Sequence, residues 1–325
     1  MSTQFDSSLF ADVADTLGLG NPAIVEKDYY VVQLLTLICA LKIEHHQIVF
    51  SGGTALAKSS VKTNRMSEDV DLKLAVNQSF LDLPSRNAKR NAKRNSRKAV
   101  MQVVETMIEN SKTFSIEKSA LILDEYRYFS FDIRYPQEYQ QAPCLRPYIK
   151  LEFVESALLS IPEKRSIQSI YARVIKSDIE IGEIACAAII ETQAEKLVSM
   201  MRRTASVARN SERDDDETLI RHIYDTYYIQ LAKPSDVESL GKLVTKVIDL
   251  DIERFGNQHP RIVKCPIDEL RYGLQLLIDE PKYAERYKRY VSPMVYAANP
   301  VAWDDALSVF MSLANEVLNY VEKTR

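Results

Sequence analysis

The sequence predicts an α+β fold in two parts: a domain over residues 1–190 with a mixed sheet of about five strands, and a helical domain over residues 191–325. Five apolar or alternating stretches, which are typical of β-strands, lie between residues 47 and 156. After about residue 190, apolar residues recur at helical spacing instead. A chain of 325 residues is long enough for two domains, and we expect the helical domain to complete a cleft with the first.

Helices are expected at the start of the chain. Asn21 followed by Pro22 is typical of an N-cap with proline at the first helical position, and apolar residues follow at helical spacing. Strands are expected, in chain order, at 47–50, 69–76, 113–124, 126–135 and 147–156. One long helix is expected at 85–111, and later helices are expected at 191–208, 217–232, 236–250, 268–278 and 305–323.

The composition is that of a globular protein, with 46% hydrophobic and 27% charged residues. A net charge of -3 argues against a nucleic-acid-binding coat over the whole surface, but it is compatible with a local basic patch. The four cysteines form no C-x-x-C pair, which favours reduced thiols over a disulfide framework or a zinc site. We see no signal peptide and no apolar run that could span a membrane, so we predict a cytoplasmic protein.

A glycine turn follows the first expected strand. Gly52 and Gly53 end the strand and open a short helix, and glycine permits positive φ and close approach of a ligand to the backbone. Backbone amides at such a turn bind phosphate, and the Thr54 hydroxyl can cap the helix or donate to a phosphate. The segment therefore indicates a phosphate-binding turn.

Two aspartates stand two residues apart on the next expected strand. Period two places the carboxylates of Asp69 and Asp71 side by side on one face. Adjacent carboxylates repel unless a cation lies between them, and Mg²⁺ prefers carboxylate and phosphate oxygens. A carboxylate pair directly after a phosphate-binding turn is what metal-assisted nucleotidyl transfer requires. Alone, either motif would more often belong to an ordinary turn or strand edge.

The joined motif resembles that of the nucleotidyltransferase toxins of the AbiEii/AbiGii type, within the polymerase-beta-like nucleotidyltransferase superfamily. That family has G-G-T-x-L-x-K leading into R-x-S-x-D-x-D-L, and the matching residues are Gly52, Gly53, Thr54, Leu56, Lys58, Arg65, Ser67, Asp69, Asp71 and Leu72. The segments at 26–35, 193–197 and 221–225 also resemble the family, so the resemblance covers about residues 20–230. It implies a polymerase-beta-like domain, Mg²⁺, a nucleoside triphosphate donor and a cognate antitoxin protein.

The resemblance also implies roles for single residues. It implies that Ser67 helps to position the triphosphate, while Lys58 and Arg65 are candidates to stabilise phosphate charge; Lys58 can equally be a solvated helix residue. Glu152 is the candidate for the third metal-binding carboxylate, because such folds place one on a neighbouring strand; the alternative is a solvent-facing ion pair with Lys150. Lys196 and Asp225 are implied to complete the site. His222 stands where the family motif often has an aspartate, which makes the role of that motif less certain here.

The segment 86–98 contains seven basic residues in thirteen. On a helix they form a wide cationic face that can bind an RNA backbone, although without an aromatic platform for reading bases. The alternatives are a solubilising helix or a surface for an acidic regulatory protein.

The function expected from the resemblance is transfer of a nucleoside monophosphate from a triphosphate to RNA. The acceptor end of tRNA is the expected target, and its modification would block translation, as in abortive infection and phage defence. Three alternatives stay open: transfer to a protein hydroxyl, a nucleotide-binding partner protein without turnover, and a glycosyltransferase. The glycine turn argues against the last, because in the superfamily it serves a triphosphate.

Overall fold

The structure, a computed structural model, describes residues 6–76, 85–141 and 144–325. Its residues separate into two compact units. The first contains residues up to 59 together with 66–187, and the second contains 60–65 together with 188–325. The short segment 60–65 thus leaves the first unit after the glycine motif, joins the second, and returns before the aspartate pair.

The first unit is built on a mixed sheet with eight strands in the described residues. The strands are β1 (His46–Ser51), β2 (Val70–Val76), β3 (Ser115–Ile116), β4 (Leu121–Leu123), β5 (Tyr128–Arg134), β6 (Ile149–Glu155), β7 (Glu163–Ile167) and β8 (Ile181–Cys186). Their order is β3-β5-β6-β2-β1-β8-β7, and β4 also pairs with β5. β2 is antiparallel to β1 and parallel to β6, so it lies at the centre of the sheet.

The two faces of this sheet differ in chemistry. Alternate residues of the central strands, such as Leu72, Phe129 and Phe153, are fully buried in one hydrophobic core. The helices that supply the other half of this core are α2 (Ala23–Cys39) and α4 (Arg86–Glu109). The opposite face carries polar side chains in register, and the row through Asp71 and Glu152 crosses β2 and β6 there. The apolar face therefore forms the core of the unit, and the polar face carries the candidate site residues.

The remaining helices of the first unit are short: α1 (Leu9–Thr16), α3 (Gly52–Ala57) and α5 (Ile170–Val174). The side chain of Asn21 accepts a hydrogen bond from the Ala23 backbone N–H at 2.8 Å, so it caps the start of α2. Ser85 caps α4 in the same way, accepting from the N–H of Ala88.

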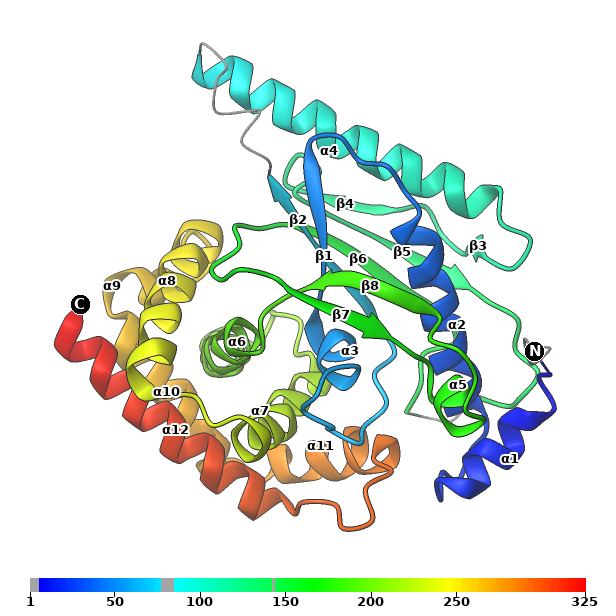
Figure 1. Cartoon of the computed structure of the whole chain (residues 1–325). Coiled ribbons are helices and arrows are strands. Elements are labelled where there is room, and N and C mark those ends of the chain that lie inside the picture. The colour runs from blue at the N-terminus through cyan, green and yellow to red at the C-terminus, as the bar shows by residue number, and fades with distance from the viewer. Residues whose placement is uncertain (1–5, 77–84, 142–143) are drawn as a thin grey trace. The chain divides into compact units, whose positions relative to one another are not determined.

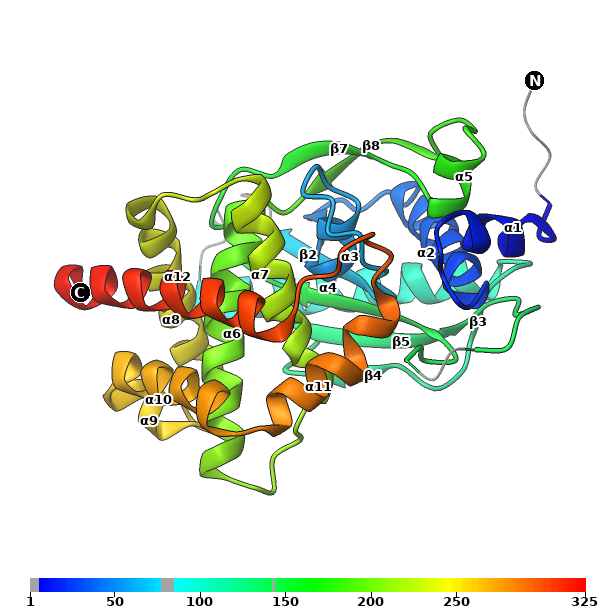
Figure 2. The same cartoon turned by 90° about the horizontal axis from the view of Figure 1, so that it is seen from below.

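The second unit is helical. It contains α6 (Ile189–Arg209), the 3₁₀ helix η2 (Glu217–Ile220), α7 (Arg221–Ala232), α8 (Val237–Phe255), α9 (Pro260–Lys264), α10 (Pro266–Asp279), α11 (Lys282–Tyr290), η3 (Ser292–Met294) and α12 (Trp303–Thr324). Figure 1 shows α6 end-on, with α7, α8, α10 and α12 packed around part of its circumference, and Figure 2 shows it along its length. Within the described residues, no helix is long and apolar enough to cross a membrane.

The predicted α+β fold is confirmed, as are the mixed sheet, the long helix after β2 and the later helices. The sheet has eight strands in the described residues where about five were expected, for two reasons. The stretch 113–124 divides into β3 and β4, and the polar hairpin of β7 and β8 was not predicted. β7 lies at one end of the strand order, and its sequence EKRSI lacks the apolar alternation of a half-buried strand.

Candidate active site

The glycine turn and the second aspartate are built against each other. Gly52 has φ of +73°, and a Cβ added to it would lie 1.8 Å from Oδ2 of Asp71. Ser51 and Asp71 are partners in the β1–β2 ladder, which explains the close approach. Only glycine satisfies both the backbone angle and the space, so this turn fixes the position of the Asp71 carboxylate.

Asp69 lies one residue before β2, still two positions from Asp71. Its backbone carbonyl accepts a hydrogen bond from the Thr54 hydroxyl, which also lies 3.0 Å from the hydroxyl oxygen of Ser67. Thr54 is 1% exposed and makes no side-chain cap to α3. The residue therefore connects the glycine turn to the aspartate segment, and its predicted contact with phosphate stays a prediction.

Glu152 is the ladder partner of Asp71 on the adjacent strand β6. The two residues face each other in register, and the Tyr128 hydroxyl donates to Glu152 at 2.5 Å. Burial alone would raise the pKa of Glu152, but the Lys150 ammonium, which forms an ion pair with it, lowers that pKa below its ordinary value. Two carboxylates on paired residues of adjacent strands repel each other, so this pair favours a cation bound between them.

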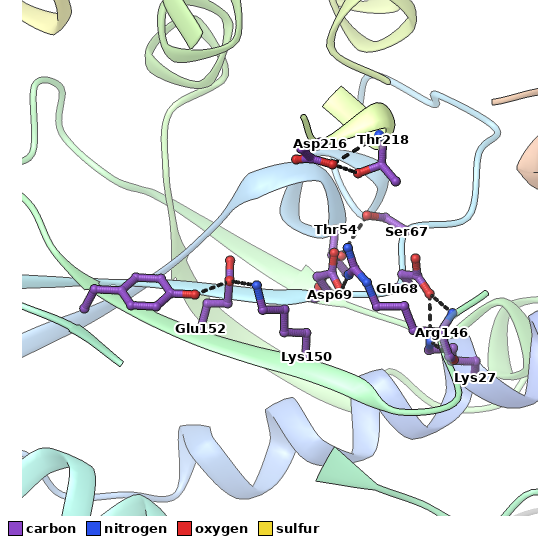
Figure 3. Close-up of polar contacts among 11 residues, drawn as sticks. Lys27, Thr54, Ser67, Glu68, Asp69, Arg146, Lys150, Glu152, Asp216 and Thr218 are labelled. Atoms are coloured by element: carbon purple, nitrogen blue, oxygen red, sulfur yellow. Dashed lines mark hydrogen bonds and ion pairs between the residues drawn. The ribbon is translucent and has the colours of Figure 1, made fainter. Parts of the chain in front are cut away.

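Two cationic side chains form ion pairs with the carboxylates of Asp69 and Glu152. Figure 3 shows Arg146 against Asp69, with Nη1 to Oδ1 at 2.5 Å, and Lys150 against Glu152. All four side chains are partly exposed. Burial alone would lower the pKa of Arg146, but the charge of Asp69 raises it above its usual value, so the guanidinium stays charged.

The donor set fits Mg²⁺ in chemistry, since carboxylate oxygens on adjacent strands are hard ligands. Among the described residues, no group of three or more acidic, histidine or cysteine side chains has the geometry to hold a metal ion. Asp69 and Glu152 each face a cation, so they would have to reorient to bind a metal ion together with Asp71. The assignment of Asp69, Asp71 and Glu152 as metal ligands stays a prediction.

A fully buried ion pair holds the backbone of Arg146. Lys27 and Glu68 are 0% and 1% exposed, with Nζ to Oε2 at 2.7 Å. The same Glu68 oxygen accepts from the Arg146 N–H at 2.9 Å, and the Lys27 ammonium donates to the Arg146 carbonyl at 2.7 Å. Sequence reasoning did not identify these residues. The one available signal was the run Glu26-Lys27-Asp28 within an otherwise apolar helix.

Lys58 forms an ion pair with Asp28 on α2, with Nζ 2.6 and 2.7 Å from the two carboxylate oxygens. Asp28 also accepts from the backbone N–H of Ile170 at 2.6 Å. Both charged side chains are nearly buried, so Lys58 is not a solvated helix residue. Its predicted role in phosphate binding is untested by these contacts.

Three other predicted residues meet inside the second unit. Asp225 is fully buried; Arg65 donates to it from Nε and Nη2 at 3.0 to 3.2 Å, and the Lys196 ammonium lies 2.9 Å away. Burial alone would raise the pKa of Asp225, but these two cations lower it to about 2. Arg65 is 2% exposed and 160 residues from Asp225 in sequence, which explains why sequence reasoning treated it as a phosphate ligand.

His222 lies on α7, less than one helical turn before Asp225. Burial lowers the pKa of His222 well below its ordinary value, and the nearby Lys196 charge adds to the effect. The imidazole is therefore neutral at physiological pH, where the related motif often carries an aspartate.

The predicted cationic face on α4 is narrower than its sequence indicates. Arg97 is 2% exposed and forms an ion pair with Glu155 at 2.8 Å, and Arg90 is paired with Glu125. The side chain of Arg86 lies outside the described part of the structure. Arg94 and Lys98 are exposed, and Lys89 and Lys93 are partly exposed. The wide cationic face predicted for this helix therefore does not include Arg97, whose guanidinium packs within the first unit.

Comparison with known proteins places these features in a family. A family model described as nucleotidyl transferase AbiEii toxin, type IV TA system, matches residues 35–309, well past the end of the resemblance recognised in the sequence. The structure is similar to MenT4, a nucleotidyltransferase toxin from Mycobacterium tuberculosis H37Rv, with a TM-score of 0.54 and 15% identity over 97% of this chain and 90% of that one. A weaker similarity, with a TM-score of 0.41 and 12% identity, covers 93% of this chain and 94% of JHP933 from Helicobacter pylori.

No curated protein sequence matched the chain. At 15% identity the similarity to MenT4 supports the fold alone, whereas the family model covers most of the chain. The chain therefore belongs to the AbiEii family of nucleotidyltransferase toxins of type IV toxin–antitoxin systems.

Proposed function

We propose that the enzyme transfers a nucleoside monophosphate from a nucleoside triphosphate to RNA in a Mg²⁺-dependent reaction, with the 3′ end of tRNA as acceptor. Membership in a toxin–antitoxin family implies a triphosphate substrate and an antitoxin partner. We propose in addition that the reaction needs Mg²⁺, that the acceptor is RNA, and that its modification blocks translation.

The observation that carries the proposal is the ladder contact between Asp71 and Glu152 beside the Gly52 turn. It brings together the carboxyl groups of Asp71 and Glu152 in register, the carboxylate of Asp69 two residues before Asp71, and a turn whose backbone angle and space require glycine. Mg²⁺ bound to Asp69, Asp71 and Glu152 would supply Lewis-acid stabilisation of charge on the triphosphate. The protein itself would contribute positioning and electrostatics, which dominate catalysis of phosphoryl transfer.

The support for RNA is the exposed part of the basic helix. Four cationic side chains of α4 are exposed (Arg94 and Lys98) or partly exposed (Lys89 and Lys93), and they can contact a phosphate backbone without reading bases. A tRNA acceptor is compatible with that mode of binding, since its strands present phosphates along the whole contact surface.

The test is incubation of the purified protein with Mg²⁺, total tRNA and each of the four radiolabelled triphosphates in turn. The Asp69→Ala/Asp71→Ala variant is the matched control. Label in tRNA with the wild-type protein alone is the expected result and identifies the donor. Label in protein instead of RNA would move the acceptor to a protein hydroxyl, and nucleotide binding without any transfer would favour a non-catalytic partner protein.

A further inference from the structure

The guanidinium of Arg146 forms an ion pair with Asp69, whose carboxylate is a predicted ligand of the metal ion. Its Nη1 lies 2.5 Å from Oδ1 of Asp69, in a pair whose side chains are 30% and 24% exposed. A cation that binds Oδ1 of Asp69 must therefore displace the guanidinium, and one that binds the other oxygen would lie beside its positive charge. The displaced guanidinium would keep its charge and would need a new anionic partner.

The backbone of Arg146 is fixed while its side chain is accessible. The buried Lys27–Glu68 pair holds both the N–H and the carbonyl of Arg146. Burying two charges costs free energy unless further hydrogen bonds satisfy the two groups. Here Glu68 and Lys27 each make such a hydrogen bond, one with the N–H and one with the carbonyl of Arg146. This arrangement holds the base of the Arg146 side chain in place and leaves the guanidinium able to turn between partners at the polar face.

The natural second partner is a triphosphate. A guanidinium binds phosphate oxygens through two parallel hydrogen bonds, as it binds a carboxylate. Lys150 forms an ion pair with Glu152, as Arg146 does with Asp69, so two of the three candidate metal ligands are already paired with a cation.

We propose that Arg146 is an exchangeable residue of the substrate site: it neutralises Asp69 before metal and nucleotide bind, releases that carboxylate to the metal ion, and then binds the triphosphate. The inference rests on the proposed function, because it takes Asp69 as a metal ligand. It adds a substrate-binding residue and a competition between side chain and metal to that function.

The test uses Arg146→Gln and two probes. Mn²⁺ binding is followed by the electron paramagnetic resonance signal of the free ion, and binding of magnesium tripolyphosphate is followed by calorimetry. Without the competing guanidinium, Mn²⁺ should bind about fivefold more tightly, as expected for loss of a partly exposed ion pair. Tripolyphosphate should bind roughly tenfold more weakly, because a charge-assisted contact is lost. Opposite changes in the two affinities are the signature of exchange.

Arg134→Gln is the matched control, since Arg134 forms an exposed ion pair with Glu117 in the same unit. It should leave both affinities unchanged. Arg146→Lys, which retains the charge, should leave Mn²⁺ affinity near that of the wild type, and thermal denaturation followed by circular dichroism checks that each variant folds. Unchanged Mn²⁺ affinity in a folded Arg146→Gln protein, or a parallel fall in both affinities, would overturn the inference.

The Asp69→Asn/Asp71→Asn variant distinguishes failure of the proposed metal site from failure of the inference about Arg146. If Mn²⁺ binds this variant as tightly as the wild type, the proposed metal site is wrong and the inference is wrong with it. If Mn²⁺ binding needs the aspartates but does not respond to Arg146→Gln, the inference alone is wrong.

Discussion

Replacement of Gly52 by alanine tests the link between the glycine turn and the aspartate pair. A Cβ at this position would lie 1.8 Å from Oδ2 and 2.6 Å from Cγ of Asp71. Real Cβ contacts stay beyond 3.0 Å, so the carboxylate or the turn must move by more than about 1 Å. The variant therefore changes the geometry of the site by adding one methyl group.

Two energies enter the expected result. Alanine at a φ of +73° costs about 1–2 kcal/mol, partly offset by about 0.4–1 kcal/mol from the lower entropy of the unfolded chain. The free energy of unfolding should thus fall by about 1 kcal/mol. Misplacement of a reacting group by about 1 Å can cost a hundredfold in rate, so kcat/KM should fall by about that factor.

Gly18 supplies the matched control. It has a φ of +65°, and an added Cβ would meet nothing within 4 Å. Gly18→Ala should lose the stability expected from the backbone angle alone and keep full nucleotidyl transfer, whereas Gly52→Ala should lose at least as much stability and also lose transfer. Transfer at the wild-type rate by Gly52→Ala would refute the reasoning that the turn positions Asp71.

Further predictions concern the charged residues. Asp225 has its pKa lowered to about 2, so its ionised form contributes about 2 kcal/mol of stability that is complete above about pH 4 and lost as the pH falls towards 2. Asp225→Asn should be about 3 kcal/mol less stable at pH 7 and should lack this acid transition in denaturant titrations. Lys58→Met should lower the melting temperature, because it leaves the buried charge of Asp28 without its cation, and Asp28→Asn should restore part of the loss in the double variant. Arg94→Gln with Lys98→Gln should weaken RNA binding and lower the slope of log affinity against log salt by about 2, as measured by filter binding.

Local patterns were sufficient to predict most of the elements and the placement of Lys150 beside Glu152. Alternation with period two placed these two side chains on one face of β6, as their ion pair shows, whereas the side-by-side placement of the Asp69 and Asp71 carboxylates stays a prediction. Helical spacing predicted the long helix and the later bundle. In each case the information lies within about one element of sequence, where side-chain direction follows from the backbone.

The partners of the charged residues were not predictable in this way. Lys27 and Glu68 are 41 residues apart, and Arg65 and Asp225 are 160 apart, so neither pair leaves a local pattern. Arg97 belongs to a run that has the composition of a solvated helix, yet its guanidinium is buried against Glu155. Charged residues are usually exposed, and only tertiary contacts reveal the exceptions.

The central claim is that Asp69 and Asp71 enable nucleotidyl transfer, and simultaneous measurement of pyrophosphate release and RNA labelling tests it most directly. The wild-type protein with Mg²⁺, tRNA and the donor triphosphate should release one pyrophosphate for each nucleotide incorporated. The isosteric Asp69→Asn/Asp71→Asn variant should remain folded and do neither. Transfer by the folded double variant at a rate comparable with that of the wild type would contradict the account.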